Sequence, residues 1–407
     1  MINKLSIRNF KSVKELDIDC ARVNLFIGEP NTGKSNILEA LGLLSWAGHK
    51  ANRPLNEYVR FQGIQNLFYD ENVENPIKIK TEGDDELSFE VTYFNREFFL
   101  LFGFSLRIPY SLLSDLESNT LSEELKKAFE DHNISLSYPS NPVKLGDDVP
   151  IPEMRGGYLI NELIIGSDAR PYVIREYDNI LMIANSKRNE CSLDYIGNIV
   201  KGNFSYDLPL IKFYKYNEKI NKFEDFNYLW LNPPYGSNLF SIIMGKKTLR
   251  EAVSNLFKDV DLRLVLKPVE NILESQKQVD DEVYGYPYIL ASDTIRRMIF
   301  YNIAIDSNEN SVLIFEEPET HAFPAYIKRL GEKIAFDETN QYFIVTHNPY
   351  LFLSIVENVP KREDVNVFMT YMKDYQTKVK MANEMEVSKL MRYDPFFNLL
   401  HMIEEEK

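Results

Sequence analysis

Residues 28–35 read Gly28-Glu29-Pro30-Asn31-Thr32-Gly33-Lys34-Ser35, which matches the pattern G-x-x-x-x-G-K-[ST] at every fixed position. The five residues before it, Val23-Asn24-Leu25-Phe26-Ile27, are mostly apolar, as is typical of a strand buried on both faces. From residue 36 to residue 44 the apolar positions follow a helical period. Because a phosphate-binding loop lies between a strand and a helix, this context favours such a loop over a simple glycine turn.

The chemistry of the loop explains its fixed residues. Glycines let the backbone curl so that N–H groups point at phosphate oxygens, and the following helix adds the positive end of its dipole. Lys34 is predicted to neutralise the outer phosphates, and the Ser35 hydroxyl to coordinate Mg²⁺. We therefore expect ATP and Mg²⁺ as cofactors. The predicted cofactor-binding residues of this stretch are Gly28, Pro30, Asn31, Thr32, Gly33, Lys34, Ser35 and Asn36.

Two adjacent carboxylates end a second apolar run. Residues 311–319 read Ser-Val-Leu-Ile-Phe-Glu-Glu-Pro-Glu, which places Glu316 and Glu317 directly after a predicted buried strand over residues 312–315. Ligands of such sheets bind at the carboxyl ends of the strands. One carboxylate can hold Mg²⁺ through water, since this ion prefers oxygen ligands, while the other polarises the attacking water as a base. The alternative is an acidic turn that caps the next helix, predicted over residues 326–335.

A histidine and a serine stand at comparable positions. His347 follows a predicted buried strand over residues 342–345 and could donate a hydrogen bond to a γ-phosphate, although a lone histidine is more often structural. Either Ser292 or Asp293 is a plausible N-cap for a helix predicted over residues 294–305, with backbone N–H groups left open to an anion. An ordinary helix cap explains that pattern equally well.

Taken in order, the loop, the Ser-Asp-Thr helix start, Glu-Glu-Pro-Glu-Thr-His and Thr-His-Asn-Pro resemble the motifs of ABC-type ATPases of the RecF, SMC and OLD kind. Residues 7–12, Ile-Arg-Asn-Phe-Lys-Ser, also look like the first strand of that group. The resemblance covers residues 1–95 and 285–355.

The resemblance implies a role for each matching residue. It implies that Lys34 binds phosphate and that Ser35 and Glu316 hold Mg²⁺. It makes Glu317 the water-activating base and His347 the switch histidine. Glu316 stands where aspartate is commoner, a replacement that OLD-like members often tolerate. The predicted catalytic residues are therefore Glu317, His347 and Lys34.

Other positions are implied by the same resemblance. Ser292 falls at the signature serine, which in such enzymes reaches the γ-phosphate bound to a second subunit, although Asp293 and Thr294 replace the paired glycines of transporters. Lys11 is expected near the base or the phosphates. Either Gln62 or Gln65 is the expected Q-loop residue, and the sequence does not choose between them.

The order of the predicted helices and strands indicates the fold class. Helices alternate with buried strands before and after a central region, which predicts an α/β fold with a sheet covered by helices. The resemblance implies that this fold is a P-loop head of the ABC type with a mixed sheet. We expect this head to be discontinuous, over residues 1–95 and 285–407, and to carry an inserted mixed α+β or helical domain over residues 96–284. Within the insertion, residues 118–129 form a good amphipathic helix pattern. Only 407 − 347 = 60 residues follow His347, without the acidic set of the Toprim domain that OLD nucleases carry, so no nuclease is expected.

Composition narrows the functional classes. The formal net charge of −15 counts against broad adhesion to nucleic acid, which needs a positive surface, but leaves room for a local basic groove. No apolar run reaches the ~18 residues of a membrane span, and the N-terminus lacks the apolar core of a signal peptide. Two distant cysteines, Cys20 and Cys191, support neither a disulfide framework nor a cysteine zinc site. We therefore expect a cytoplasmic protein.

These expectations combine into one ATP-dependent mechanism, whose biological function the sequence leaves open. Two copies are predicted to sandwich ATP between the P-loop of one and Ser292 of the other, so at least a dimer is expected. The first hypothesis is a defence-type (anti-phage) sensor or scaffold whose ATP state controls a separately encoded effector. The alternative is a RecF-like DNA repair or maintenance ATPase that binds DNA. A kinase or GTPase module is disfavoured, because Ser292 and His347 would then have no role.

Overall fold

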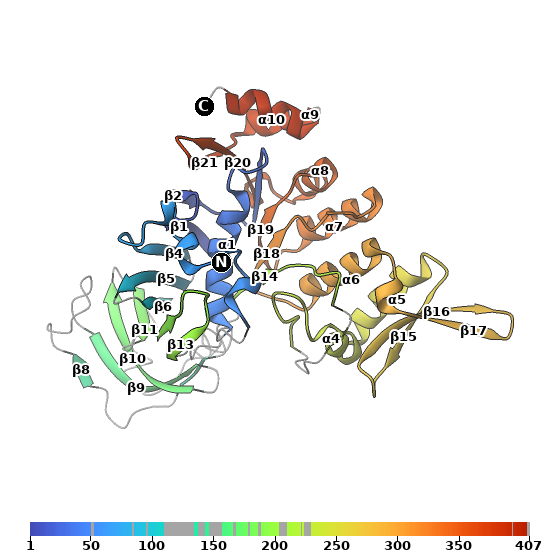
Figure 1. The fold of residues 1–407 in the computed structure, drawn as a ribbon, viewed down its shortest axis with the longest axis horizontal. Helices are drawn as coiled ribbons and strands as arrows, with labels where there is room; N and C mark the ends of the chain where they lie inside the picture. The colour runs from blue at the N-terminus through green and yellow to red at the C-terminus, as the bar shows by residue number, and fades with distance from the viewer. Residues whose placement is uncertain are drawn as a thin grey trace. The chain divides into compact units, whose positions relative to one another are not determined.

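The computed structural model of the chain describes residues 1–49, 53–83, 85–94, 97–109, 134–136, 143–145, 157–165, 168–177, 180–185, 189–202, 210–220, 222–223, 229–392 and 394–404. The chain divides into two compact units (Figure 1). Unit 1 holds residues 1–19 and 39–211, and unit 2 holds residues 20–38 and 212–407. These bounds differ from those of the predicted head and insertion, whose division remains a proposal.

Unit 1 is built on an antiparallel sheet, ordered β2-β1-β4-β5-β6-β11-β10-β9-β7, with β12 and β13 beside β6 and β8 beside β9. The strands are β1 (Ile2–Phe10), β2 (Val13–Asp19), β4 (Ile77–Gly83), β5 (Asp85–Phe94), β6 (Glu97–Pro109), β7 (Ile134–Leu136), β8 (Val143–Leu145), β9 (Gly157–Ile165), β10 (Asp168–Tyr177), β11 (Ile180–Asn185), β12 (Asn189–Leu193) and β13 (Ile199–Gly202). Short 3₁₀ helices lie at Leu55–Glu57, Ile64–Leu67 and Tyr69–Glu71.

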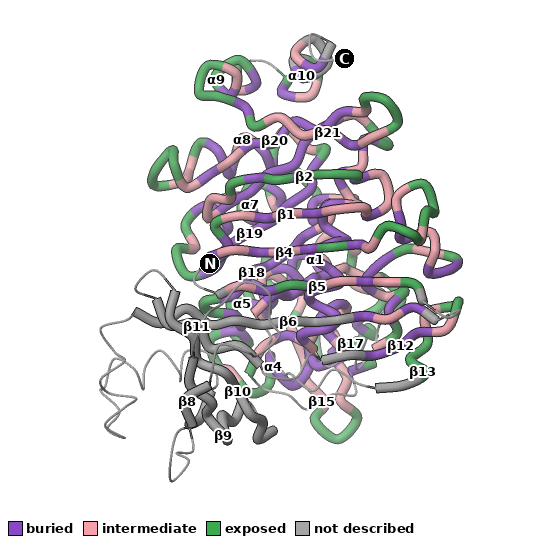
Figure 2. The backbone as a smooth tube through the Cα atoms, turned by 90° about the vertical axis from the view of Figure 1, so that its left-hand side faces the viewer, coloured by how far each residue is buried: buried purple, intermediate pink, exposed green. Residues whose placement is uncertain are grey.

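Alternating burial explains why the first strands of unit 1 form. In β1, Leu5 and Ile7 are buried and lie opposite Ile18 and Leu16 of β2. The same alternation of buried and exposed positions runs through β4 and β5 (Figure 2). One apolar side chain in every two gives a sheet one buried face, so these strands place one face in the core of the unit. The helix predicted over residues 118–129 lies outside the described residues.

Unit 2 holds a six-stranded sheet in the order β14-β18-β19-β3-β20-β21. Strands β18, β19, β3 and β20 pair in parallel, whereas β20 and β21 pair antiparallel, so the sheet is mixed and the predicted α/β class is confirmed. The strands are β14 (Ile211–Tyr214), β18 (Val312–Glu316), β19 (Gln341–Val345), β3 (Val23–Gly28), β20 (Val365–Lys373) and β21 (Gln376–Met381). A second, three-stranded sheet contains β15 (Arg263–Lys267), β16 (Ile272–Val279) and β17 (Glu282–Pro287).

Helices cover this mixed sheet as predicted. Figure 1 shows α6 (Asp293–Asp306), α7 (Pro324–Phe336) and α8 (Pro349–Asn358) side by side against one face. The other helices in the described part of the unit are α4 (Leu239–Gly245), α5 (Lys247–Lys258), α9 (Glu384–Arg392) and α10 (Pro395–Glu404), with 3₁₀ turns at Tyr288–Leu290 and Arg362–Asp364. Helix α1 (Lys34–Gly48) begins in unit 2 and continues into unit 1. Within the described residues, no helix has the length and apolar character that a membrane crossing requires.

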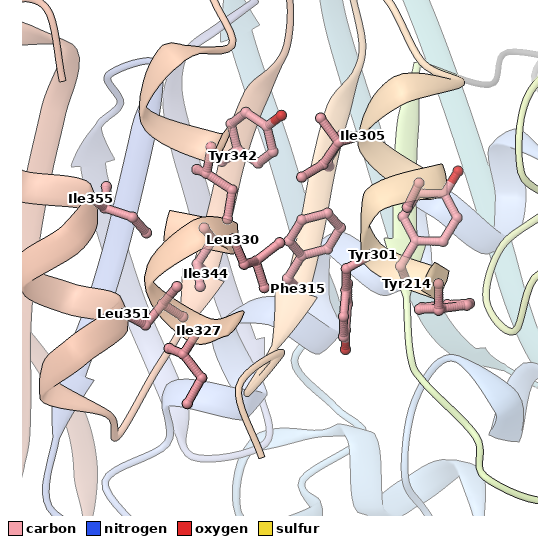
Figure 3. Close-up of a cluster of buried hydrophobic side chains, with 14 of the residues drawn as sticks. Tyr214, Tyr301, Ile305, Phe315, Ile327, Leu330, Tyr342, Ile344, Leu351 and Ile355 are labelled. Atoms are coloured by element: carbon pink, nitrogen blue, oxygen red, sulfur yellow. The ribbon is translucent and has the colours of Figure 1, made fainter. Parts of the chain in front are cut away.

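The core of unit 2 fixes the position of the loop that follows β3. On one face of the sheet, Phe315, Tyr342 and Ile344 pack against helix residues such as Leu330 and Leu351 (Figure 3). On the opposite face, Phe26 stacks on Phe368 at 5.0 Å and on Phe343 at 6.5 Å between ring centroids. Both faces of β3 are therefore packed, and burial of each large side chain contributes on the order of 2 kcal/mol.

Candidate active site

The loop of residues 28–35 has the backbone conformation of an anion cradle. Strand β3 ends at Gly28 and helix α1 begins at Lys34. Between them, Asn31 and Gly33 have positive φ values of 62° and 88°, in the left-handed region that turns the chain sharply. A Cβ atom at Gly28 would lie 2.3 Å from the Thr370 Oγ1 atom and 2.4 Å from the Thr370 carbonyl oxygen, so only glycine fits there.

Threonines on two separate segments hold the loop. The Thr32 hydroxyl lies 2.8 Å from the Glu29 carbonyl oxygen and 2.9 Å from the Thr370 hydroxyl of β20. The Thr370 hydroxyl in turn lies 3.1 Å from the carbonyl oxygen of Ile27. Strand β20 thus supports the loop from the neighbouring position in the sheet. Thr370 was not predicted from the sequence, because the loop and β20 are more than 300 residues apart and no local motif marks the contact.

Lys34 is folded back onto the loop. Its Nζ atom donates hydrogen bonds to the carbonyl oxygens of Gly28 (3.0 Å) and Glu29 (2.7 Å), and the residue is only 4% exposed. Burial lowers the pKa of Lys34 to about 8, although the charges of Glu317 and Glu29 act in the opposite direction. At pH 7 the amine therefore remains mostly protonated, and the loop holds a cation at the position where the outer phosphates are expected.

The carboxylate pair lies at a turn after β18. Glu316 is the last residue of the strand, and Glu317 has a φ of 45°, which is uncommon for a side chain other than glycine and often marks a functional site. The Glu317 backbone N–H donates to the Val345 carbonyl oxygen at 2.9 Å. The Thr320 hydroxyl lies 3.0 Å from the Glu317 carbonyl oxygen and 3.4 Å from its Oε2 atom. These contacts hold the strained turn in place.

The structure brings His347 to Glu317. The His347 Nε2 atom lies 3.5 Å from the Glu317 Oε1 atom, and both side chains are about two-fifths exposed. Burial and the positive charge of Lys34 lower the pKa of His347, against the opposing effect of Glu317, so the ring is neutral at pH 7. The three residues predicted to be catalytic, Glu317, His347 and Lys34, are therefore electrostatic neighbours.

A small cavity adjoins this cluster. Its volume is about 180 Å³, and its lining residues are Gly28, Glu29, Pro30, His347, Phe396 and Leu399. It is smaller than the ~300–1,000 Å³ of most ligand pockets, so it fits part of a nucleotide rather than a whole one. Two of the lining residues come from α10, and the Phe396 ring lies 6.2 Å from the His347 ring. No sequence motif predicted that α10 would lie at the site.

Ser292 is the N-cap of α6. Its side-chain oxygen accepts a hydrogen bond from the Ile295 N–H at 3.3 Å, so the structure places the cap at Ser292 rather than at Asp293. Asp293 instead accepts a hydrogen bond from the Tyr216 hydroxyl at 2.9 Å. The Thr294 hydroxyl donates to the His321 carbonyl oxygen at 3.2 Å, which joins the start of α6 to the turn after Glu317. The predicted contact of Ser292 with a second subunit stays a prediction.

Lys11, Gln62 and Gln65 belong to unit 1. The Lys11 amine forms an ion pair with the buried carboxylate of Glu39 and donates to the Arg60 carbonyl oxygen at 2.6 Å. The Gln65 side-chain amide donates to the Tyr195 hydroxyl at 2.8 Å. A role of Lys11 at the nucleotide, and the choice between Gln62 and Gln65, remain predictions.

The residues present fit ATP and Mg²⁺. The close approach of Thr370 to Gly28 and the left-handed turns leave a curled backbone of the kind that surrounds phosphate oxygens. Ser35 lies in the first turn of α1, and Glu316 ends a strand that shares its neighbour, β19, with β3. A hydroxyl and a carboxylate are the hard oxygen ligands that Mg²⁺ prefers.

Comparison with known proteins finds local matches to ATPases and to a DNA repair protein. Residues 1–153 match the family model of an AAA ATPase domain, which is somewhat over a third of the chain. A segment of 78 residues is 32% identical to the DNA replication and repair protein RecF of Leptospira interrogans. That match covers 19% of this chain and 21% of the relative, so the chain spans about a fifth of the length of the curated protein it matches. Together with the motifs, these matches support an ABC-type P-loop ATPase.

Solved structures of SMC heads resemble the chain more loosely. An SMC head bound to the C-terminal winged-helix domain of ScpA has a TM-score of 0.44 and 16% identity, over 95% of this chain and 99% of that one. The SMC head domain of Thermotoga maritima has a TM-score of 0.35 and 11% identity, over 94% of this chain and 99% of that one. At these values the likeness carries no conclusion about activity, and the OLD-like subgroup remains a prediction.

Proposed function

We propose that this protein binds ATP with Mg²⁺ at residues 28–35 and hydrolyses it. The observation that carries the proposal is the grouping of Lys34, Glu317 and His347 beside the loop, with a distance of 3.5 Å between the Glu317 and His347 side chains. A cation can neutralise charge on the outer phosphates and a carboxylate can orient the attacking water, which are two tasks in phosphoryl transfer to water.

Each residue then has one task. Lys34, mostly protonated at pH 7, neutralises charge on the outer phosphates. Glu317 accepts a proton from the attacking water, and a positioned base of this kind accelerates a reaction by roughly 10²–10⁴-fold. The neutral ring of His347 donates its single N–H to the γ-phosphate, and the 3.5 Å distance between the His347 and Glu317 side chains keeps the base close to this histidine. When bound at Ser35 and Glu316, Mg²⁺ neutralises charge on the phosphates.

Two copies of the chain assemble around ATP in this proposal. Ser292 caps α6, and the first backbone N–H groups of a helix attract anions, so this end of α6 suits contact with a γ-phosphate held by another copy. ATP binding then joins the two copies, and hydrolysis releases them. A closed symmetric pair is the simplest such assembly.

The assembled pair acts as a nucleotide-gated switch, and we favour a defence-type sensor or scaffold that controls a separate effector protein. The excess of 61 acidic over 46 basic residues supports this use, because DNA-binding surfaces are usually basic. The second candidate is DNA repair or maintenance, and the local match to RecF favours it. DNA binding would then require a local basic groove on the assembled pair.

The test is ATP turnover of purified protein with Mg²⁺, compared between wild type and Glu317→Gln. The variant is expected to bind ATP, to hydrolyse it at least a hundredfold more slowly, and to accumulate as a dimer in size-exclusion chromatography with ATP. Glu251→Gln, on the exposed face of α5, is the matched carboxylate-to-amide control and should behave as wild type. Wild-type turnover in Glu317→Gln would place the base elsewhere.

A second measurement distinguishes the sensor or scaffold function from DNA repair or maintenance. Turnover is followed with and without duplex DNA at 50 mM and 200 mM salt. DNA-stimulated turnover that weakens steeply with salt supports the repair function, because phosphate contacts release counterions. Turnover that is indifferent to DNA at both salt concentrations supports the sensor or scaffold function.

A further inference from the structure

The third carboxylate of the Glu-Glu-Pro-Glu sequence has no role in the mechanism above, although it is the most buried of the three. Glu319 is 5% exposed, whereas the side chain of Glu317 is 42% exposed. A buried carboxylate is costly unless hydrogen bonds replace its lost hydration. Its partners therefore indicate what it is for.

The side chain of Glu319 accepts hydrogen bonds from the segment that carries His347. The Glu319 Oε1 atom accepts from the Thr346 hydroxyl at 2.6 Å and from the His347 backbone N–H at 3.1 Å. The Thr346 oxygen also accepts from the Asn348 backbone N–H at 3.0 Å. One carboxylate oxygen thus holds Thr346 and His347 directly, and the Thr346 hydroxyl holds Asn348, at the point where β19 ends and α8 is about to begin.

A second contact joins the same two segments. The Glu317 backbone N–H donates to the Val345 carbonyl oxygen at 2.9 Å, immediately before the residues that Glu319 holds. The turn after β18 and the corner after β19 are therefore connected at two points. Between those points lies the 3.5 Å contact of Glu317 with His347. A rigid connection on both sides leaves this pair little freedom to separate.

The remaining oxygen of Glu319 is not used for this connection. Its Oε2 atom is buried and has no hydrogen-bond partner within the described part of the chain. Burial raises the pKa of Glu319 to about 7, even though the hydrogen bonds from Thr346 and His347 act in the opposite direction. A buried polar atom left unpaired is uncommon and destabilises the folded state. A residue retained for stability alone would avoid that cost.

We propose that Glu319 is a positioning residue for ATP hydrolysis: it holds the backbone of His347 and so sets the geometry of the His347–Glu317 pair. The inference rests on the proposed function of that pair. Displacement of a catalytic group by about 1 Å reduces a rate by roughly 10²-fold. Glu319 therefore acts on turnover, whereas ATP binding depends on the loop of residues 28–35.

The experiment compares Glu319→Leu with Glu319→Gln by steady-state ATP hydrolysis. Leucine removes both hydrogen bonds, so kcat is expected to fall about a hundredfold while KM changes less than threefold. Glutamine retains a side-chain oxygen that can accept both hydrogen bonds, so its kcat is expected to stay within about threefold of wild type. Glu251→Leu, at the exposed position on α5, is the control for the change of charge and should leave kcat unchanged.

A double-mutant cycle with His347→Ala shows whether Glu319 acts through the histidine. In the His347→Ala background, Glu319→Leu is expected to change kcat less than threefold, because no imidazole remains to be positioned. Independent, multiplicative losses would overturn the proposal. If Glu319→Leu does not fold, Thr346→Val tests the same connection from the other side. Its effect on kcat is expected to depend on His347 in the same way. An effect on kcat that is independent of His347 would count against the proposal.

The ATPase function and the positioning role of Glu319 are rejected by different experimental results. If wild-type protein with Mg²⁺ hydrolyses no ATP, the proposed function itself is wrong. If wild type hydrolyses ATP and Glu319→Leu has an unchanged kcat, or loses only stability in a denaturant titration, the ATPase stands and the positioning role is wrong.

Discussion

Replacement of Gly28 by alanine tests the geometry of the loop most directly. The added Cβ atom would lie 2.3 Å from the Thr370 Oγ1 atom and 2.4 Å from the Thr370 carbonyl oxygen, far inside van der Waals contact. A side chain can rotate away, but the carbonyl belongs to β20, which pairs with β3 at this position. Either the two strands separate or the loop shifts, and both outcomes disturb the curled backbone that is to bind phosphate.

The magnitude follows from overpacking. Extra methyl groups in well-packed cores cost typically 1–3 kcal/mol, and a fixed carbonyl places Gly28→Ala at the upper end, about 3 kcal/mol. That energy lowers the folding equilibrium constant by roughly a hundredfold. A shift of the loop that removes one hydrogen bond to a charged phosphate costs a further ~1.5–3 kcal/mol in binding, so the Kd for ATP is expected to rise at least tenfold.

The assay pairs guanidinium denaturation with calorimetric titration of ATP. Gly285→Ala is the matched control, because a Cβ there would meet only the Glu274 Oε2 atom at 3.5 Å; its stability is expected to stay within ~0.5 kcal/mol of wild type. Combining Gly28→Ala with Thr370→Ala removes the hydroxyl clash but not the carbonyl clash, so only partial recovery is expected. Wild-type stability and affinity in Gly28→Ala would refute the close packing of β20 against the loop.

Three further predictions concern the catalytic groups. Lys34→Ala is expected to abolish tight ATP binding, and near-normal affinity by calorimetry would contradict the assignment of phosphate binding. Ser292→Arg is expected to block hydrolysis while ATP still binds, and full turnover would remove the contact between two copies. Because the pKa of His347 is lowered in the folded chain, its neutral form persists below the usual value of 6.5. The unfolded chain takes up a proton first as pH falls below 6.5, so stability is lost from there down to the pKa of the folded chain, where the neutral ring is also lost. Turnover should therefore stay level from pH 7.5 to 6.5 and decline only below that range, whereas a decline that begins above pH 7 would contradict a neutral His347.

The local sequence determined where several strands, the loop of residues 28–35 and the helix after it form. The apolar run of residues 23–27, the fixed residues of the loop and the helical period after it define β3 and α1 without reference to the rest of the chain. The same holds for β18 and β19, whose ends place Glu316 and His347 at the carboxyl ends of parallel strands. Periodic burial and motif spacing are properties of short segments, so they can be read before the chain is folded.

Only the tertiary structure decided which of these segments meet. The contact of Thr370 with Gly28, the connection of Glu319 to Thr346 and His347, and the cavity beside α10 join residues between 27 and more than 300 positions apart. No local period encodes them, because they depend on the order and register of strands in the sheet. The sequence is sufficient to identify the residues that can bind and cleave a phosphate. The packing of the sheet determines the distances between these residues.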